Sequence, residues 1–534
     1  DARVAQLLQV WREIQDLPRH LGQHPGGMII AAGRLDEVVP LEPASMADRV
    51  IIQWDKEDVA DLGIVKIDLL GLGMMAALEE AVRLCPAVDG VPFDMAALPA
   101  DDPAVYRMLS QADTVGVFQI ESRAQMAILP RVKPSRFYDL VVQVGLIRPG
   151  PIVGKMVHPY LRRRCGEEAV RFPHPSLEPI LARTLGIPLF QEQVMRVAMV
   201  AAGFTGGQAE LLRRAMDSKR GEAQMQAMIA QLREGMQKKQ LPAETAEEIV
   251  TAVTSFAQYG FPESHAISFA TITYASAYLK TYHPGVFYTT LLNAWPMGFY
   301  HPSTLVKDAQ RHGVRVLPIE INASQIQCTL QREEDSQSAH SVHQESQRKP
   351  ARLLRVGLRF VRGLSEKSAQ AIVQARQQAP FHSLSDFKRR CPSLSAQELS
   401  TLAEIGAFTN LEGRPSRRDA LWQVSELSTT REGLLMGASA SAESAHSPLA
   451  TMSLAERISA DHQGATFTVG PHPLALIRPV LQAAGVLPAT ALLQRPNGAQ
   501  VQLAGIVIVR QRPPTARGFF FVTLEDETGL TNLI

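Results

Sequence analysis

A lysine and an aspartate stand two residues apart in the segment Gly63-Ile-Val-Lys-Ile-Asp-Leu-Leu-Gly71, at Lys66 and Asp68. Successive side chains of a strand point to opposite faces, so a strand here places both charges on one face and apolar side chains on the other. Two charges in an apolar strand are costly to bury unless they pair or hold a ligand. The carboxylate suits Mg²⁺ and the ammonium suits a phosphate. A structural lysine–aspartate pair explains the same pattern.

Two adjacent arginines, Arg213 and Arg214, follow the pair Gly206-Gly207 in a segment with helical periodicity. The guanidinium fork matches the oxygens of a phosphate, so neighbouring arginines on one helix can clamp a polyphosphate. The alternative is an exposed helix in which Arg213 pairs with Asp217 one turn later. The sequence spacing is compatible with both interpretations.

A third candidate site lies at the start of a predicted helix that ends near His283. Ser264 is the predicted N-cap, which places His265 in the first turn, where backbone N–H groups favour anions. His265 can then donate a hydrogen bond to a phosphate oxygen. Tyr274 and Tyr278, one turn apart, are candidates for stacking on a base or for packing in the core.

A short turn followed by a helix is predicted in Arg362-Gly-Leu-Ser-Glu-Lys367. The turn at Gly363 precedes a helix that starts at Ser365, so backbone N–H groups and the Lys367 ammonium can face a phosphate without reading base sequence. The segment 402–408 indicates a second hairpin of the same kind. Together they predict a tandem helix-hairpin-helix module that contacts DNA through Arg362, Gly363, Ser365 and Lys367.

Apolar residues alternate between 499 and 534, and turn residues interrupt them, which predicts short strands. The pattern fits the first strands of an OB-fold, which binds single strands through charged grooves and aromatic platforms. Phe519 and Phe520 are the candidate platform residues. At least one residue of the run Phe519-Phe520-Phe521 must face a core.

The composition is that of a globular protein, with 46% apolar residues and a net charge of +1. Between 353 and 420, eleven basic residues stand against six acidic ones, which favours a polyanion as partner, although a solvated helical surface gives the same count. The four widely spaced cysteines provide no CxxC pair for zinc and no disulfide framework. No stretch reaches the roughly 20 apolar residues that cross a bilayer, so we expect a soluble, cytoplasmic protein.

Familiar signatures of other enzyme classes are absent or incomplete. The segment 150–156 resembles a phosphate-binding Walker A loop, but its glycine spacing is one residue short and Met156 replaces the serine or threonine. No HExxH and no GxSxG occurs. ATPase, metalloprotease and α/β-hydrolase interpretations are therefore weak.

Several segments in one order resemble the motifs of the bacterial C-family DNA polymerases, the DNA polymerase III alpha-subunit type. They are His24-Pro-Gly-Gly-Met-Ile-Ile30, Val65-Lys-Ile-Asp-Leu-Leu-Gly-Leu72, Val117-Phe-Gln-Ile-Glu-Ser-Arg123, Ile147-Arg-Pro-Gly-Pro151, Phe190-Gln-Glu-Gln-Val-Met195, Leu212-Arg-Arg-Ala-Met216 and Tyr259-Gly-Phe261 with Ser264-His265. The resemblance covers nearly the whole chain.

The resemblance implies a nucleotidyltransferase that adds dNTPs to the primer 3′-hydroxyl of primer–template DNA by two-metal phosphoryl transfer with Mg²⁺. Asp68 would be the third metal-binding aspartate of the palm. Lys66, Arg213, Arg214 and His265, with Ser264 beside it, would surround the incoming triphosphate.

The family's other two metal-binding aspartates lie upstream of the position of Asp68, and no matching pair occurs in the 67 residues before it. The chain also begins at Asp1 inside a helical pattern. We therefore expect a fragment of a longer protein that binds DNA but does not polymerise by itself.

Within the family, the sequences of three segments resemble those of the error-prone, translesion branch: Gln23-His-Pro-Gly-Gly27, Phe261-Pro-Glu-Ser-His265 and Gly470-Pro-His-Pro473. Replicative members carry a short clamp-binding peptide between the hairpin module and the OB-fold, and none occurs between 423 and 498. Recruitment to the sliding clamp would then depend on accessory proteins of a mutagenesis complex. The alternatives are the replicative alpha subunit and a non-catalytic DNA-binding scaffold of the same fold.

The expected architecture is α+β and multidomain. Its parts are the end of a thumb-like helical region (1–23), the C-terminal part of the palm (24–72), helical fingers (73–330), a polar linker (331–350), the tandem helix-hairpin-helix module (351–422), a flexible linker and connecting segment (423–498) and the start of an OB-fold (499–534).

Overall fold

The computed structural model describes residues 2–15, 26–44, 48–147, 157–217, 222–256, 261–297, 300–332, 352–429, 447–492, 494–512 and 520–533. The chain divides into two compact units, Asp1–Gly73 and Met74–Ile534. The division falls one residue after the expected end of the palm segment at 72. Each unit is described by itself.

The first unit contains small antiparallel ladders. Its elements are α1 (Ala2–Glu13), β1 (Gly27–Ile30), η1 (Leu35–Glu37), β2 (Leu41–Pro43), β3 (Val50–Ile52), α2 (Lys56–Asp61) and β4 (Val65–Asp68). β1 pairs with β4 and β2 pairs with β3. Helix α2 was not predicted. It begins where the Asp55 carboxylate accepts the N–H of Asp58 at 2.9 Å, as an N-cap does.

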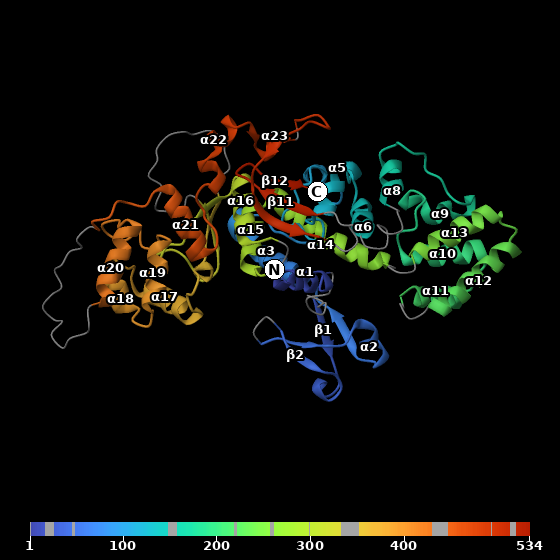
Figure 1. The fold of residues 1–534 in the computed structure, drawn as a ribbon, viewed down its shortest axis with the longest axis horizontal. Coiled ribbons are helices and arrows are strands. Elements are labelled where there is room, and N and C mark those ends of the chain that lie inside the picture. The colour runs from blue at the N-terminus through green and yellow to red at the C-terminus, as the bar shows by residue number, and fades with distance from the viewer. Residues whose placement is uncertain are drawn as a thin grey trace. The chain divides into compact units, whose positions relative to one another are not determined.

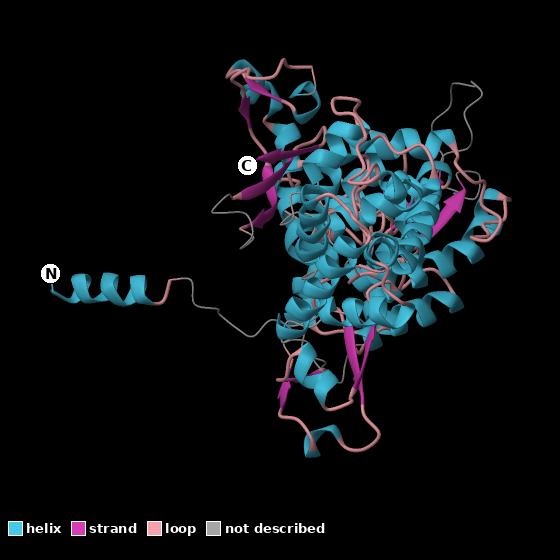
Figure 2. Cartoon of the chain, turned by 90° about the vertical axis from the view of Figure 1, so that its right-hand side faces the viewer, coloured by secondary structure: helices cyan, strands magenta, loops and turns pink. Residues whose placement is uncertain are grey.

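Helices dominate the first part of the second unit, as predicted (Figure 2). They are α3 (Leu72–Asp89), α4 (Pro103–Ser110), α5 (Arg123–Val132), α6 (Phe137–Leu146), α8 (Val157–Arg164), α9 (Glu178–Leu181), α10 (Gln191–Ala202), α11 (Gly206–Asp217), α12 (Glu222–Lys238), α13 (Ala243–Phe256), α14 (Glu263–Tyr282), α15 (Pro284–Ala294) and α16 (Pro302–Arg311). Two 3₁₀ turns, η2 (Pro175–Leu177) and η3 (Ala182–Thr184), flank α9.

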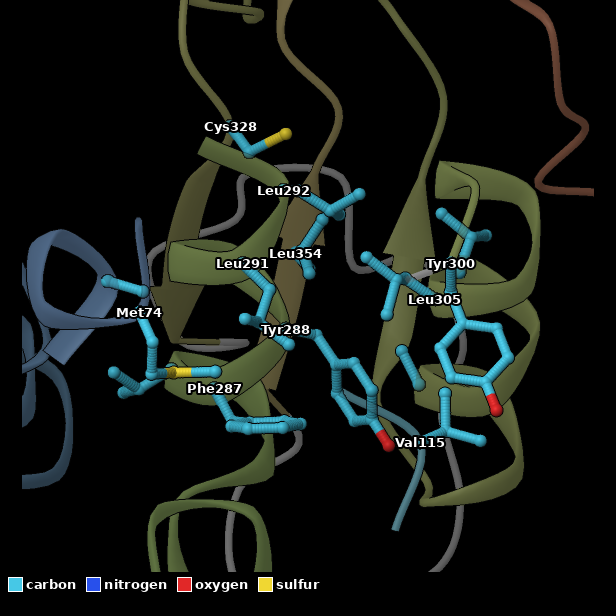
Figure 3. Close-up of a cluster of buried hydrophobic side chains, with 14 of the residues drawn as sticks. Met74, Val115, Phe287, Tyr288, Leu291, Leu292, Tyr300, Leu305, Cys328 and Leu354 are labelled. Carbon is cyan, nitrogen blue, oxygen red and sulfur yellow. The ribbon is translucent and has the colours of Figure 1, made fainter. Parts of the chain in front are cut away.

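The largest hydrophobic cluster is built around α14, which packs on α4, α6 and α15. Apolar residues surround most of this helix, which is the pattern of a helix buried on several sides. Figure 3 shows part of the same cluster, where Tyr288, Leu291 and Leu292 of α15 lie beside Leu354. Tyr274 of α14 belongs to this core.

A second, separate hydrophobic cluster holds α9 to α13 together. Figure 1 shows α10, α11, α12 and α13 gathered around it. Helix α10 contacts both α11 and α12, and α12 contacts α13. The predicted arginine helix, α11, is therefore part of a lobe with a core of its own.

A three-stranded sheet leads into the next helical group. Its strands are β5 (Arg315–Leu317), β6 (Thr329–Arg332) and β7 (Arg352–Arg355), in the order β5-β7-β6. The helices that follow are α17 (Glu366–Gln378), α18 (Leu384–Arg390), α19 (Ala396–Glu404) and α20 (Arg417–Thr429), after the 3₁₀ turn η5 (Leu358–Phe360). Residues 333–350 of the predicted polar linker lie outside the described residues.

The range 423–498, predicted as a flexible linker and connecting segment, contains folded elements. They are the end of α20 and then α21 (Leu454–Ala465), η6 (Pro473–Leu476), α22 (Arg478–Ala483), β8 (Val486–Leu487) and α23 (Ala489–Leu492). A capping box at Ser453 and Glu456 starts α21, and α21 packs on α19. The Ser- and Ala-rich stretch 437–446 lies outside the described residues.

The final strands are β9 (Gln502–Leu503), β10 (Ile506–Gln511), β11 (Phe521–Glu525) and β12 (Leu530–Leu533). β10, β11 and β12 form an antiparallel meander, with a turn at 526–529 between β11 and β12. The meander packs against the helical core: Arg311 of α16 pairs with Glu525 at 3.1 Å and donates to the Asp526 carbonyl at 2.9 Å.

No helix within the described ranges combines the length and the apolar character that crossing a bilayer needs.

Candidate active site and DNA-contacting residues

Strand pairing brings together two of the segments that carry the family resemblance. In the β1–β4 ladder, Gly27 lies opposite Asp68 and Ile29 lies opposite Lys66. The Asp68 carboxylate accepts the backbone N–H of Leu70 at 3.0 Å. Gly26 leaves little room next to it, because a Cβ atom there would lie 3.0 Å from the Leu70 nitrogen and 3.2 Å from the Asp68 carboxylate.

Lys66 and Asp68 line a hollow of about 350 Å³ together with Val59, Ala60 and Ile64. All four residues of β4 are exposed, so neither charge is buried in an apolar strand. Because the Lys66 and Asp68 side chains are exposed to solvent, their charges carry no desolvation cost. The two charged groups are therefore open to a ligand from outside the unit.

The Asp68 carboxylate offers one hard oxygen ligand for a metal ion. Mg²⁺ is commonly held by one or two carboxylates together with substrate phosphates and waters. The described clusters of three metal-ligating side chains lie elsewhere, at Cys85, Asp89 and His283 and at Asp113, Asp308 and His312. Asp68 thus fits a part of a magnesium site, and the rest of the ligands must come from other residues or from substrate.

Arg213 and Arg214 lie in the second and third turns of α11, and both contact Glu210. Arg213 forms a bidentate pair with this carboxylate, at 2.9 and 2.8 Å, and Arg214 binds it at 3.1 Å. The hydrogen bond from Arg213, reinforced by Arg214, lowers the pKa of Glu210 to about 2. The Asp217 side chain, proposed as the alternative partner of Arg213, lies outside the described residues.

The start of α14 differs from the prediction at one residue. Pro262 is the N-cap residue, with extended φ and ψ angles, so the prediction of Ser264 as N-cap is wrong. Glu192 of α10 takes over the capping role, because its carboxylate accepts the N–H of Glu263 at 2.9 Å. Ser264 is exposed in the first turn, and His265 follows it there, as predicted.

The His265 ring stands between two phenylalanines. Phe261 lies edge-on at 5.0 Å and Phe269 lies tilted at 4.1 Å, measured between ring centroids. The spacing of four residues places the His265 and Phe269 rings on one side of α14, and Phe261 lies just ahead of the helix. The stack fixes the ring plane of the half-buried imidazole.

The two tyrosines of α14 pack in the protein. Tyr274 is buried, donates to the Pro99 carbonyl at 2.5 Å and accepts the Asp102 N–H at 3.0 Å. Tyr278 is half-buried and stacks on Tyr282 at 4.7 Å. The core interpretation therefore explains Tyr274, and no base-stacking role is required for it.

The first predicted hairpin has an open turn. Gly363 has a φ of +76°, and a Cβ atom placed there would meet no atom within 4 Å. Ser365 caps α17 by accepting the Ser368 N–H at 3.0 Å. Lys367 is exposed in the first turn of the helix. The backbone N–H of Arg362 is already used, since it donates to the Gly464 carbonyl at 2.7 Å.

One buried carboxylate joins the two helices of this hairpin region. Glu398 of α19 accepts the Ser365 N–H at 3.0 Å and the Ser395 N–H at 2.8 Å. Burial raises the pKa of Glu398, but the hydrogen bonds from Ser365 and Ser395 outweigh burial and lower the pKa to about 2. The Ser365 N–H is therefore not available to a phosphate, contrary to the prediction.

The second predicted hairpin is closed. Gly406 follows α19 with a φ of +82°, but a Cβ atom there would lie 2.8 Å from the Arg417 guanidinium. The next helix, α20, begins only at Arg417. Arg417 donates to the Glu404 carbonyl at 3.0 Å and pairs with Asp461 of α21 at 2.7 Å. The two turns are thus different, contrary to the prediction of one kind.

Most of the basic residues between 353 and 420 have internal partners. Ion pairs with carboxylates engage Arg355, Arg389, Arg390, Arg417 and Arg418. Backbone carbonyls accept hydrogen bonds from Arg359, Arg362, Arg376 and Lys388. In the described part of the chain, no side-chain partner is found for Lys367 and Arg414. The local excess of positive charge is therefore largely structural.

Of the three phenylalanines at 519–521, Phe519 lies outside the described residues. Phe520 is 38% exposed, and the Arg510 guanidinium lies over its ring at 5.0 Å. Phe521 turns the other way, with Arg123 of α5 at 5.5 Å from its ring. We expected at least one of the three to face a core. Phe521 is half-buried, and of the two described residues neither Phe520 nor Phe521 belongs to a hydrophobic cluster.

The roles of three acidic residues were not predicted from the sequence: Glu210, Glu192 and Glu398. The spacing of Glu210 from the two arginines, three and four residues, is a helical ion-pair signal and was available in the sequence. Glu398 stands three residues after Ser395, which is the capping-box pattern. Glu192 gave no signal, because it acts on a helix that begins 71 residues later.

Three family models match the chain. Residues 1–71 match the bacterial DNA polymerase III alpha NTPase domain, residues 74–240 match the bacterial DNA polymerase III alpha subunit finger domain, and residues 313–420 match a helix-hairpin-helix motif. The error-prone DNA polymerase of Anaeromyxobacter sp. (strain K) is 48% identical over the whole of this chain, which covers 47% of that protein. The chain belongs to the bacterial C-family DNA polymerases, in their error-prone branch.

Other members of this error-prone branch give the same result. The error-prone DNA polymerase of Alkalilimnicola ehrlichii is 45% identical over 100% of this chain and 50% of its own length. That of Methylococcus capsulatus is 45% identical over 99% of this chain and 50% of its own length. The chain spans about half the length of the curated relatives it matches.

Proposed function

We propose that this chain carries part of the active site of an error-prone, DNA-directed DNA polymerase that acts in translesion synthesis and DNA repair. The observation that carries the proposal is strand β4 of the β1–β4 ladder, on which Lys66 and Asp68 stand two residues apart and both line an open hollow. The printed names of the relatives, error-prone DNA polymerase, support the branch.

Asp68 is proposed as a ligand of Mg²⁺, together with the two further aspartates that the family resemblance implies. When bound, such ions stabilise the attacking and leaving oxygens of phosphoryl transfer. The ammonium of Lys66 faces the same hollow and offsets negative charge on the phosphates. Residues 24–72, which contain β1 and β4, are likewise proposed as the C-terminal part of a palm.

Arg213, Arg214 and His265, with Ser264, are proposed to hold the triphosphate of the incoming dNTP. The two guanidinium groups provide fork-shaped donors, and the first turn of α14 provides a positive helix end. As the primer 3′-hydroxyl attacks the α-phosphate, pyrophosphate leaves, and these cationic groups stabilise the charge that moves onto it.

DNA contacts are proposed for the open hairpin and for the final sheet. The open turn at Gly363 and the exposed Lys367 can approach a phosphate, with Arg362 and Ser365 beside them. Phe520 and Phe519 are proposed as stacking residues of an OB-fold that begins at 499. Accessory proteins of a mutagenesis complex are proposed to recruit the polymerase to the clamp in the cytoplasm.

Primer extension by the complete gene product tests the catalytic part, with Asp68→Asn against Asp36→Asn. Both are exposed aspartates of the first unit, but Asp36 pairs with Arg34 at 2.6 Å and does not line the hollow. Asp68→Asn should lower dNTP incorporation by on the order of 100-fold or more, because metal ligation contributes several kcal/mol to the transition state. Affinity for DNA should be nearly unchanged.

Undiminished incorporation by Asp68→Asn would contradict the assignment of Asp68. If the wild-type gene product binds primer–template DNA but incorporates no dNTP, the non-catalytic scaffold replaces the polymerase as the proposed function.

Salt-dependent binding of primer–template DNA tests the hairpin, with Lys367→Ala against Arg389→Ala. Arg389 is exposed but pairs with Asp386 at 2.7 Å. Loss of one phosphate contact in Lys367→Ala should weaken DNA binding and lower the slope of log K against log salt by about 1. An equal slope in both variants would remove Lys367 from the interface.

A further inference from the structure

Gln119 adopts an unfavourable backbone conformation in the loop between α4 and α5. Its φ angle is +64°, in the left-handed region that glycine and, less often, asparagine or aspartate occupy. Its side chain is half-buried. Strain of this kind persists where the surrounding structure determines it strongly, and it gathers at ligand-binding positions.

The neighbours of Gln119 are held on both sides by hydrogen bonds. The Phe118 N–H donates to the Ser276 hydroxyl at 3.2 Å, and the Phe118 carbonyl accepts the Thr273 hydroxyl at 3.1 Å. The Ile120 carbonyl accepts the Thr114 hydroxyl at 2.8 Å. Each of these hydroxyl groups is buried. The backbone around Gln119 is thereby fixed to α14 and to its own loop.

A buried ion group fixes the beginning of the same loop. Lys280 of α14, whose side chain is 0% exposed, lies 2.9 Å from both Asp113 and Asp308 and donates to the Val115 carbonyl at 3.1 Å. His312 binds the other oxygen of Asp113 at 2.7 Å. The loop therefore carries Gln119 at a position that two sets of buried contacts define.

A row of aromatic rings links this loop to His265. The Phe118 ring meets the Phe269 ring edge-on at 5.2 Å, and Phe269 lies at 4.1 Å from the His265 ring. Gln119, next to Phe118, is thus two ring contacts from the imidazole. The loop that carries Gln119 and the proposed phosphate site at His265 therefore share one neighbour, the Phe269 ring.

We infer that Gln119 contacts the nucleoside part of the dNTP. This inference rests on the proposed function, in which His265 holds the triphosphate. The side-chain amide offers two N–H donors and one carbonyl acceptor, which match the hydroxyl of a deoxyribose and the edge of a base. The fixed, strained backbone presents this amide without a cost for ordering the backbone on binding.

Calorimetric titration of the 534-residue chain with dATP and with inorganic tripolyphosphate tests the inference. Wild type should bind dATP more tightly than tripolyphosphate. Gln119→Gly removes the amide and relieves the strained φ, so dATP affinity should fall roughly five- to tenfold, tripolyphosphate affinity should stay the same, and the melting temperature should rise. Lower affinity with higher stability is not expected from a residue that only packs.

Ala112→Gly is the matched backbone control. Ala112 begins the same loop and has a φ of +57°, but its methyl group offers no hydrogen bond. This variant should also raise the melting temperature and should leave dATP affinity unchanged. His265→Ala should lower the affinity for both dATP and tripolyphosphate.

The outcomes separate the inference from the proposed function. If His265→Ala weakens both ligands while Gln119→Gly leaves dATP affinity unchanged, the role of Gln119 is overturned and the triphosphate site stands. Equal affinity of wild type for dATP and tripolyphosphate overturns the inference in the same way. If His265→Ala changes neither ligand, the triphosphate site falls and the inference falls with it.

Discussion

The chain holds two groups of lysine and aspartate that have the same chemistry and opposite surroundings. Lys66 and Asp68 stand on β4, which is exposed along its whole length. Lys280 is fully buried between Asp113 and Asp308. Only the exposed group was visible in the sequence, because its residues are two apart, whereas the buried group joins residues from α14, α16 and a loop.

The difference shows that burial, not residue type, decides what such a group does. An exposed ammonium and carboxylate keep their hydration and can exchange it for a ligand. A buried lysine is costly unless every partner is in place. Burial lowers the pKa of Lys280, but the charges of Asp308 and Asp113 outweigh burial, and the pKa is raised. Lys280 therefore remains charged and acts as a fixed structural cation.

The largest expected effect is that of Lys280→Met. Removing the cation leaves Asp113 and Asp308 without their buried partner, so the free energy of unfolding should fall by about 3–5 kcal/mol. Urea denaturation followed by circular dichroism measures this. A loss below about 1 kcal/mol would show that the buried Lys280 group contributes no more to the free energy of unfolding than an exposed group does.

Glu398→Gln extends the comparison to a buried carboxylate without a lysine partner, because backbone N–H groups hold Glu398 in place of the ammonium that holds Asp113 and Asp308. Replacing it should cost about 1–3 kcal/mol at pH 7, since a glutamine keeps the shape but loses charge-assisted hydrogen bonds. Its pKa of about 2 lies below the ordinary glutamate value, so the stabilisation is complete above about pH 4.5 and disappears as the pH falls toward 2. Urea midpoints of both proteins between pH 3 and 7 test this; a constant difference would contradict it.

His312→Gln tests the pH dependence of the buried group. Burial lowers the pKa of His312, but the hydrogen bond and charge of Asp113 outweigh burial, and the pKa is raised. Stability from the protonated ring is therefore complete below the unfolded value, about pH 6.5, and is lost as the pH rises through the folded pKa. Thermal melts should show the variant clearly less stable at pH 6 and closer to wild type at pH 9. The reverse trend would mean that the ring is neutral in the folded protein.

The smallest expected effect is that of Lys66→Met, the counterpart of Lys280→Met. An exposed lysine contributes little to folding, so the free energy of unfolding should stay within about 0.5 kcal/mol of wild type. The same denaturation experiment measures it. A loss comparable to that of Lys280→Met would mean that β4 is buried in the folded protein.

Local patterns predicted the parts of the fold that local contacts determine. The strand at 65–68, the turn at Gly363 and the position of His265 in the first turn of α14 agree with the structure. The turn at Gly363 followed from the glycine and the serine cap alone. The strand followed from alternation, although its exposure did not.

Contacts between distant segments account for the differences. Ser264 has the chemistry of an N-cap, but Pro262 already has the extended backbone, and Glu192 supplies the acceptor from another helix. The hairpin at Gly406 is closed by Arg417, which α21 holds through Asp461. Helix α21 lies in the range predicted as a flexible linker and connecting segment, where no helix was predicted. Such partners cannot be inferred from spacing along one segment.

The pair between Arg311 and Glu525 has a practical consequence for cutting the chain into pieces. The sequence suggests a cut at 498/499, just ahead of the final strands. That cut would separate Arg311 from Glu525, and Arg478 from Asp526, which it binds at 3.1 Å. Burial raises the pKa of Glu525 even with Arg311 present. A piece that ends at 498 would expose a guanidinium-lined surface to the solvent, so a stable expression boundary must keep the meander with α16.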